Sequence, residues 1–110
     1  MTDFEKDLRH AERETEECVA FMQEKMEKCI DIFRKKNPPY GNSFFRSLRR
    51  YGIKVGVARL FDKFSRIESL LHGTLNTVPD ETVEDTLVDL ANYSLMMAYA
   101  IHKSKEDDRI

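Results

Sequence analysis

The sequence predicts an all-α protein, a small bundle of about four helices that begins with one long helix. The 110 residues include only four glycines and three prolines, and a sheet protein of this length needs more tight turns than these residues supply. Apolar side chains recur at steps of three and four, the spacing of a helix face, rather than at the step of two that a strand requires. Charged residues make up 35% of the chain and hydrophobic residues 41%, a balance typical of amphipathic helices.

The first helix is predicted over Asp3–Lys36, a segment without glycine or proline. Thr2 and Glu5 have the spacing of a capping box. Such a helix is about 50 Å long, and one small domain cannot cover so long an apolar stripe. We therefore expect a homo-oligomer assembled through this helix, with a solvated N-terminal extension as the alternative. The stripe consists of Phe4, Leu8, Ala11, Thr15, Cys18, Met22, Cys29 and Ile32.

Three further helices follow a break at residues 37–42, where two prolines remove backbone donors. Ser43 is predicted to cap a short helix that ends at Gly52. The third helix is expected from Val55 to Leu71, with Gly73 ending it. The last helix is expected to be capped by Asp80 and to end near residue 102.

Each of the last two helices carries an apolar stripe, which we expect to face the core of the bundle. The stripe of the third helix consists of Val57, Leu60, Phe61, Phe64, Ile67 and Leu71. The stripe of the last helix consists of Val83, Leu87, Leu90, Ala91, Leu95, Ala98 and Ile101.

The chain length predicts a single domain over residues 1–110. Residues 1–16 form the polar start of the long helix, 17–101 the core, and 102–110 a charged tail. Cys18 and Cys29 are three helical turns apart, about 16 Å, too far for a disulfide within a continuous helix. No apolar leader or membrane-length apolar stretch occurs, so we expect a reduced cytoplasmic protein without membrane contact.

The net charge of −2 provides no positive field that would attract nucleic acid. The most basic part of the chain contains Arg46, Arg49, Arg50 and Lys54. Four cations near aromatic side chains are weak evidence for nucleic-acid binding, and we interpret this cluster as a solvated face.

Two rows of polar side chains form the first candidate site, because each row occupies one face of a helix. Facing polar rows can form a charged cleft inside a helical bundle, where ligands often bind. Alternatively, the cations and carboxylates pair with one another across the helix interface. The first row consists of Arg59, Asp62, Lys63 and Arg66, and the second of Asp85, Asp89 and Asn92, with Tyr93 beside it.

The segment KKNPPYGNSF is the second candidate. Lys36 offers a cation, Tyr40 a ring on which a base can stack, and Ser43 a helix N-terminus whose amides favour a phosphate. The same residues also make a good structural turn with Tyr40 packed on the core, and the spacing leaves both interpretations open. No catalytic residue is assigned, because the chain has neither a phosphate-binding P-loop nor histidines at metal-ligand spacing.

The segments KKNPPYGNSF, VARLFDKFSRIESLL and ETVEDTLVDLANYSLMMA resemble the nucleotide modification associated domain 1 family of phages and bacteria. The resemblance spans about residues 17–101 and implies a role in nucleotide metabolism.

The helical layout is also similar to that of the MazG-like all-α nucleoside triphosphate pyrophosphatases, which hold magnesium with carboxylates from two helices. That resemblance places Asp62 and Asp89 at metal-ligand positions, with Asp85 as a third carboxylate. Arg59 and Thr86 stand where those enzymes have carboxylates, and arginine is better suited to direct phosphate recognition than to metal binding.

We therefore expect a small phage-type protein that binds a phosphorylated nucleotide without a cofactor. It would sequester a nucleotide or a cyclic nucleotide signal, or support nucleotide modification. Arg59, Lys63 and Arg66 would hold the phosphates, and Tyr40, Asn92 or Tyr93 the base or sugar. One alternative is a magnesium-dependent pyrophosphatase that uses Asp62, Asp85 and Asp89, and a second is a helical assembly module that acts through the first helix.

Overall fold

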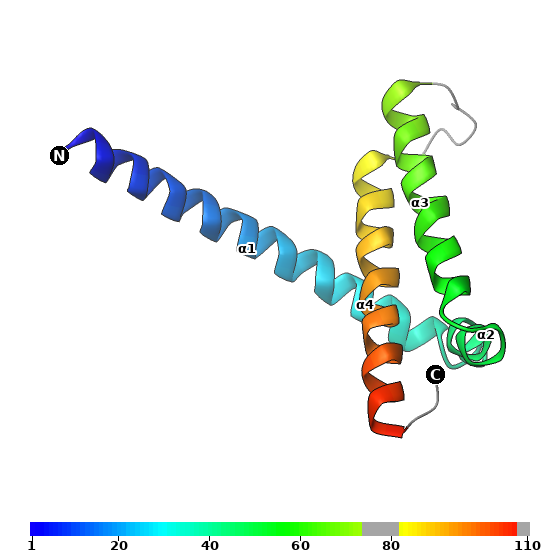
Figure 1. Ribbon diagram of the computed structural model, residues 1–110. Helices are drawn as coiled ribbons and strands as arrows, with labels where there is room; N and C mark the ends of the chain where they lie inside the picture. The colour runs from blue at the N-terminus through cyan, green and yellow to red at the C-terminus, as the bar shows by residue number, and fades with distance from the viewer. Residues whose placement is uncertain (74–81, 108–110) are drawn as a thin grey trace. The chain divides into compact units, whose positions relative to one another are not determined.

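The computed structural model describes residues 1–73 and 82–107, which form four helices and no strand. The helices are α1 (Asp3–Lys36), α2 (Ser43–Tyr51), α3 (Lys54–His72) and α4 (Val83–Asp107) (Figure 1). The predicted all-α bundle is therefore confirmed. The chain divides into two compact units, Met1–Pro38 and Pro39–Ile110, which are described separately below. The predicted division into a polar start (1–16), a core (17–101) and a charged tail (102–110) stays a prediction.

The first unit is α1 and its flanking residues, and α1 has the predicted bounds. Its N-terminus is capped as the sequence indicated, because the Glu5 N–H donates to Thr2 Oγ1 at 3.1 Å. Acidic residues in the first turn and basic residues in the last turn match the helix dipole. Cys18 and Cys29 are both free thiols, as predicted. No residue of α1 is buried.

The turn before α2 contains two consecutive left-handed residues, Gly41 at φ 63° and Asn42 at φ 57°. Asn42 is the N-cap residue, and it makes no side-chain capping bond. The prediction that Ser43 caps α2 is therefore wrong: Ser43 is the first helical residue, and its carbonyl accepts a hydrogen bond from Ser47 Oγ at 2.9 Å. Gly52 ends the helix at φ 89°, as predicted.

The second unit is built around α3 and α4, which run side by side in opposite directions (Figure 1), with α2 packed against α3. Its buried apolar side chains are Leu48, Ile67, Met97 and Ala100. Gly56 is also buried and allows the two long helices to approach closely, because a Cβ at this position would lie 2.7 Å from Met97 Sδ.

α4 begins after Thr82, whose Oγ1 accepts a hydrogen bond from the Asp85 N–H at 3.0 Å. The predicted cap, Asp80, lies outside the described residues. α4 continues to Asp107 instead of ending near residue 102. In its last turns Lys103 forms an ion pair with Glu106 at 3.7 Å, and His102 Nε2 lies 3.1 Å from Glu106 Oε1. No helix within the described ranges is long and apolar enough to cross a bilayer.

The predicted orientation of the two apolar stripes is largely wrong. On α3, Ile67 is buried and Leu60 half-buried, and on α4, Val83 and Leu90 are half-buried. The other members of both stripes are exposed. α4 instead directs Thr86, Met97 and Ala100 inward. We call the exposed members the outer face: Val57, Phe61, Phe64 and Leu71 of α3 with Leu87, Ala91, Leu95, Ala98 and Ile101 of α4.

The physical reason is that α3 and α4 contact each other through a side of mixed polarity. Apolar periodicity marks the side of a helix that avoids water, but it does not specify which surface covers that side.

Candidate functional site

The two predicted polar rows meet at one ion pair between α3 and α4. Lys63 Nζ lies 2.6 Å from Asp89 Oδ2, with 26% of the lysine side chain and 42% of the aspartate side chain exposed. The pair is therefore open to solvent and to a competing anion.

Aromatic rings adjoin this ion pair. Lys63 Nζ lies 5.7 Å from the centroid of the Tyr93 ring, a cation–π distance. Phe44 of α2 contacts the same ring edge-to-face at 5.1 Å between centroids. All three helices of the second unit thus contribute to one group, which we call the Lys63 site: Phe44, Lys63, Asp89 and Tyr93.

Sequence reasoning found three members of the Lys63 site and missed Phe44. Phe44 and Phe45 are adjacent in a short amphipathic helix, and Phe45 in turn contacts the Tyr99 ring at 5.6 Å. Such an aromatic pair on a short helix was the available signal that α2 packs on another helix through its rings.

The remaining polar residues of the two rows surround the Lys63 site on α3 and α4. Arg59 and Arg66 are exposed on α3, four residues before and three residues after Lys63, so the three cations share one side of the helix. Asn92 is half-buried on α4 beside Tyr93. This side of the helix pair can therefore present several cations and an amide to an anionic ligand.

The predicted loop residues lie in different places. Lys36 is the last residue of α1 and belongs to the first unit. Tyr40 is 65% exposed, so the alternative in which its ring packs on the core is wrong. Ser43 begins α2. The role of these three residues in ligand binding stays a prediction.

The three candidate metal ligands do not form a metal-binding group. Asp62 and Asp85 are exposed, and Asp89 is engaged by Lys63. Within residues 1–73 and 82–107, no three histidine, cysteine or acidic side chains are placed to hold a metal ion together. Thr86 is 2% exposed and donates its hydroxyl hydrogen to the Thr82 carbonyl at 3.1 Å, so it is a buried residue of the helix interface.

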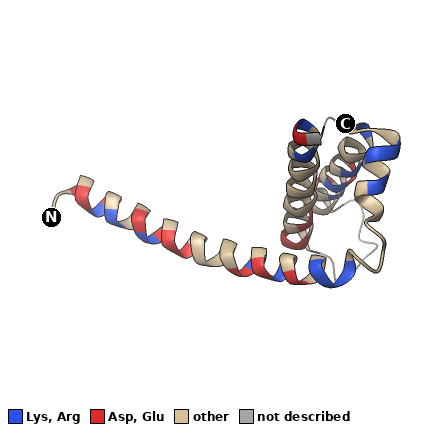
Figure 2. Ribbon diagram, turned by 90° about the horizontal axis from the view of Figure 1, so that it is seen from below, with Lys and Arg blue, Asp and Glu red and all other residues tan. Residues whose placement is uncertain are grey.

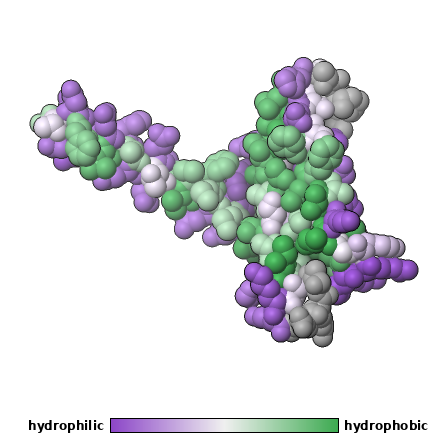
Figure 3. Space-filling view, viewed as in Figure 1, coloured by the Kyte–Doolittle hydropathy of each residue, from purple (hydrophilic) through white to green (hydrophobic). Residues whose placement is uncertain are grey.

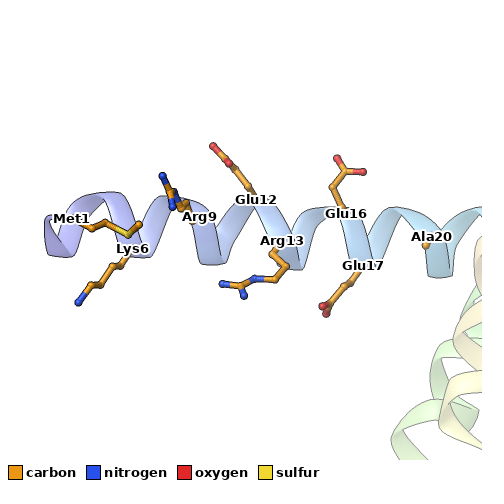
Figure 4. A pocket seen from close by; sticks show the side chains of 8 residues that line it. All are labelled: Met1, Lys6, Arg9, Glu12, Arg13, Glu16, Glu17 and Ala20. Carbon is orange, nitrogen blue, oxygen red and sulfur yellow. The ribbon is translucent and has the colours of Figure 1, made fainter.

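A pocket on α1 is a weaker candidate (Figure 4). Its eight lining residues all lie between Met1 and Ala20, and they point in several directions around one helix. A small-molecule site normally has walls from several elements. The Lys63 site, with three contributing helices, fits that description better.

Comparison with known proteins agrees with the predicted resemblance over the second unit. The family model for nucleotide modification associated domain 1 matches residues 36–101. No curated protein and no solved structure matches the chain. The match begins at the end of α1, later than the predicted residue 17, and contains every residue of the Lys63 site. Because the matched segment covers more than half of the 110 residues, the chain belongs to the nucleotide modification associated domain 1 family.

Proposed function

We propose that the chain is a binding protein for a phosphorylated nucleotide and that the phosphates contact Lys63, Arg59 and Arg66. The observation that carries this proposal is the partly exposed Lys63–Asp89 pair at 2.6 Å, which has an arginine one helical turn away on each side. Membership of a family associated with nucleotide modification supports the choice of a nucleotide over other anions.

The interaction energies favour replacement of Asp89 by a phosphate as the partner of Lys63. A partly exposed ion pair contributes about 0–1 kcal/mol to stability. A hydrogen bond to a charged group contributes about 1.5–3 kcal/mol, and contacts to phosphate belong to the stronger class of charge-assisted bonds. A phosphate held by Lys63 and the two arginines therefore compensates for a weakened Lys63–Asp89 contact.

Base or sugar recognition is assigned in this proposal to Tyr40, Asn92 and Tyr93. The exposed Tyr40 ring offers a stacking surface, and stacking on an aromatic ring is tolerant of base identity. The Asn92 amide provides two donors and an acceptor for an edge of the base. Ser43, the first residue of α2, would add a phosphate contact.

The proposal also includes a homo-oligomer formed through α1. Support comes from the apolar stripe of this helix, of which Phe4, Leu8 and Met22 are 76%, 48% and 52% exposed. Side chains of this kind at helical spacing are typical of a coiled-coil seam.

The test is calorimetry of the full chain with a panel of nucleotides that differ in base, phosphate number and cyclisation, each with and without Mg²⁺. We expect binding without Mg²⁺ and without turnover. Arg59→Ala and Lys63→Met should each weaken binding about 10- to 150-fold, the equivalent of about 1.5–3 kcal/mol. Arg34→Ala and Lys28→Met are the matched controls: both side chains are exposed on α1 and lie outside the α1 pocket. These variants should leave the affinity unchanged.

Two results would contradict the proposal. An unchanged affinity in both site variants would remove these cations from the binding site. Release of pyrophosphate that requires Mg²⁺ and disappears in Asp89→Asn would instead favour the pyrophosphatase alternative, in which Mg²⁺ would supply Lewis-acid chemistry.

A further inference from the structure

The outer face of the second unit is a large apolar surface that no described side chain of the second unit covers. Phe61, Leu71 and Leu95 are 65%, 68% and 58% exposed, and Phe64 and Val57 are 53% and 56% exposed. Burying such a side chain contributes about 1.5–3 kcal/mol relative to leaving it exposed. Single exposed apolar residues are common, but a contiguous patch of this kind marks an interaction site.

The middle of α4 is largely apolar, whereas its two ends are charged. Its residues 90–101 contain no charged side chain, and Figure 2 shows the helix without charge over most of its length. Ala91, Leu95 and Ala98 are exposed and lie on a different side of the helix from Met97 and Ala100. A helix segment that is apolar on more than one side is normally covered on more than one side.

The exposed residues of the two helices form one surface. The outer-face residues of α3 follow steps of four, three and seven and those of α4 steps of four and three, so each set occupies one side of its helix. Figure 3 shows apolar residues gathered over both α3 and α4 on the side turned to the viewer. The side chains of this surface differ in size, since α3 contributes the large Phe61 and Phe64 whereas α4 contributes the small Ala91 and Ala98.

We propose that a second copy of this chain covers the outer face, with the outer faces of the two copies packed against each other about a twofold axis. With the twofold axis parallel to the two helices, α3 of one copy lies over α4 of the other, so that Phe61 and Phe64 meet the α4 surface that contains Ala91. A self-complementary patch is what a twofold dimer requires.

The exposed area agrees with a stable dimer. The outer face carries seven large side chains, Val57, Phe61, Phe64, Leu71, Leu87, Leu95 and Ile101, each exposed by 39–68%. At about 100 Å² each, they present about 700 Å² per copy. The two copies together would bury about 1,400 Å², inside the range of about 1,200–2,000 Å² for specific stable interfaces.

The stripe of α1 is a poorer match in length. Phe4 to Ile32 spans about 42 Å of helix, whereas Val57 to Leu71 spans about 21 Å. If α1 covered the outer face, about half of its own stripe would remain exposed. A second outer face has the same length by construction.

The experiment is light scattering of the full chain during size-exclusion chromatography, over a concentration series, with three substitutions of alanine by glutamate. Ala98→Glu places a carboxylate in the outer face, Ala11→Glu places one in the α1 stripe, and Ala20→Glu is a matched exposed position on the other side of α1. Helix content by circular dichroism shows that each variant is folded.

We expect the wild-type chain to be at least a dimer and Ala98→Glu to weaken that association at least about 100-fold, as an unpaired buried charge does. Ala20→Glu should leave the mass unchanged. A lower mass for Ala11→Glu would bear on the α1 contact alone. If Ala98→Glu lost helix content, Phe61→Ala is the second variant, and it should also weaken association because its exposed ring contributes little to a single copy.

A monomeric wild-type chain at about 100 μM would overturn the proposal, as would variants at both Ala98 and Phe61 that retain the wild-type mass. Nucleotide binding at the Lys63 site does not enter this measurement, so the two proposals succeed or fail separately.

Discussion

Gly56→Ala tests the close packing of α3 on α4. A Cβ at this position would meet three atoms of Met97, with Sδ at 2.7 Å, Cε at 2.8 Å and Cγ at 3.0 Å. The terminal atoms can move by rotation about the Met97 side chain, but Cγ is near the backbone of a buried residue that is only 7% exposed. The substitution therefore forces the methionine, or α4 itself, to shift.

Two opposing effects set the magnitude. Alanine is favoured over glycine inside a helix by about 0.8–1 kcal/mol, whereas overpacking a core contact costs about 1–3 kcal/mol. We expect Gly56→Ala to lower the free energy of unfolding of the wild-type chain by about 0–2 kcal/mol. In a Met97→Ala background the obstructing side chain is gone, so the same substitution should raise stability by about 0.5–1 kcal/mol.

The assay is urea unfolding followed by helix ellipticity for the four proteins of this double-mutant cycle, at one fixed protein concentration. Met97→Ala alone should lower the free energy of unfolding by about 2–5 kcal/mol, as removal of a large core side chain does. The cycle can be measured in this background when the wild-type free energy of unfolding exceeds that loss. For a less stable wild type, Met97→Leu is the milder background. A stabilisation of the wild type by about 1 kcal/mol, or the same effect in both backgrounds, would refute the close contact.

Two further predictions concern local contacts of the second unit. Thr82→Ala removes the hydrogen bond at 3.0 Å from the Asp85 N–H and should lower the free energy of unfolding by about 1 kcal/mol. The control is Thr15→Ala, which removes a mid-helix hydroxyl of α1. Equal effects of the two substitutions in urea unfolding would argue against a capping role for Thr82. Phe44→Leu removes the edge-to-face contact with Tyr93 at 5.1 Å. It should cost about 0.5–1.5 kcal/mol beyond the lost area and should lower nucleotide affinity in calorimetry, whereas Phe21→Leu on α1 should change neither; an unaltered affinity for Phe44→Leu would separate the ring from the site.

The helices were predictable because their bounds depend on neighbouring residues. Thr2 and Gly73 act within a few positions of themselves, and the structure has Asp3 as the first residue of α1 and Gly73 as the C-cap of α3. The start of α2 was misassigned by one position, because the left-handed conformation of Asn42 is not marked by a hydrophobic pattern.

The candidate site was predictable only in part. The spacing placed Lys63 and Asp89 in rows that can face each other, and the structure joins them at 2.6 Å. Phe44 entered through tertiary packing of α2 on α4, which spacing along one helix does not encode. The prediction that Leu95 and its neighbours face the core was wrong for a related reason. An apolar stripe has the same sequence pattern whether it packs on a helix of its own chain or on another surface.

The backbone of the turn before α2 gives the Tyr-Gly-Asn-Ser segment a meaning that does not depend on a ligand. Gly41 and Asn42 both adopt a conformation that glycine and asparagine tolerate far better than other residues. A search for related chains that relies on this tetrapeptide would therefore collect proteins that reverse the chain in the same way, whatever they bind. Signatures intended to find the same chemistry should give their weight to positions 63, 89 and 93.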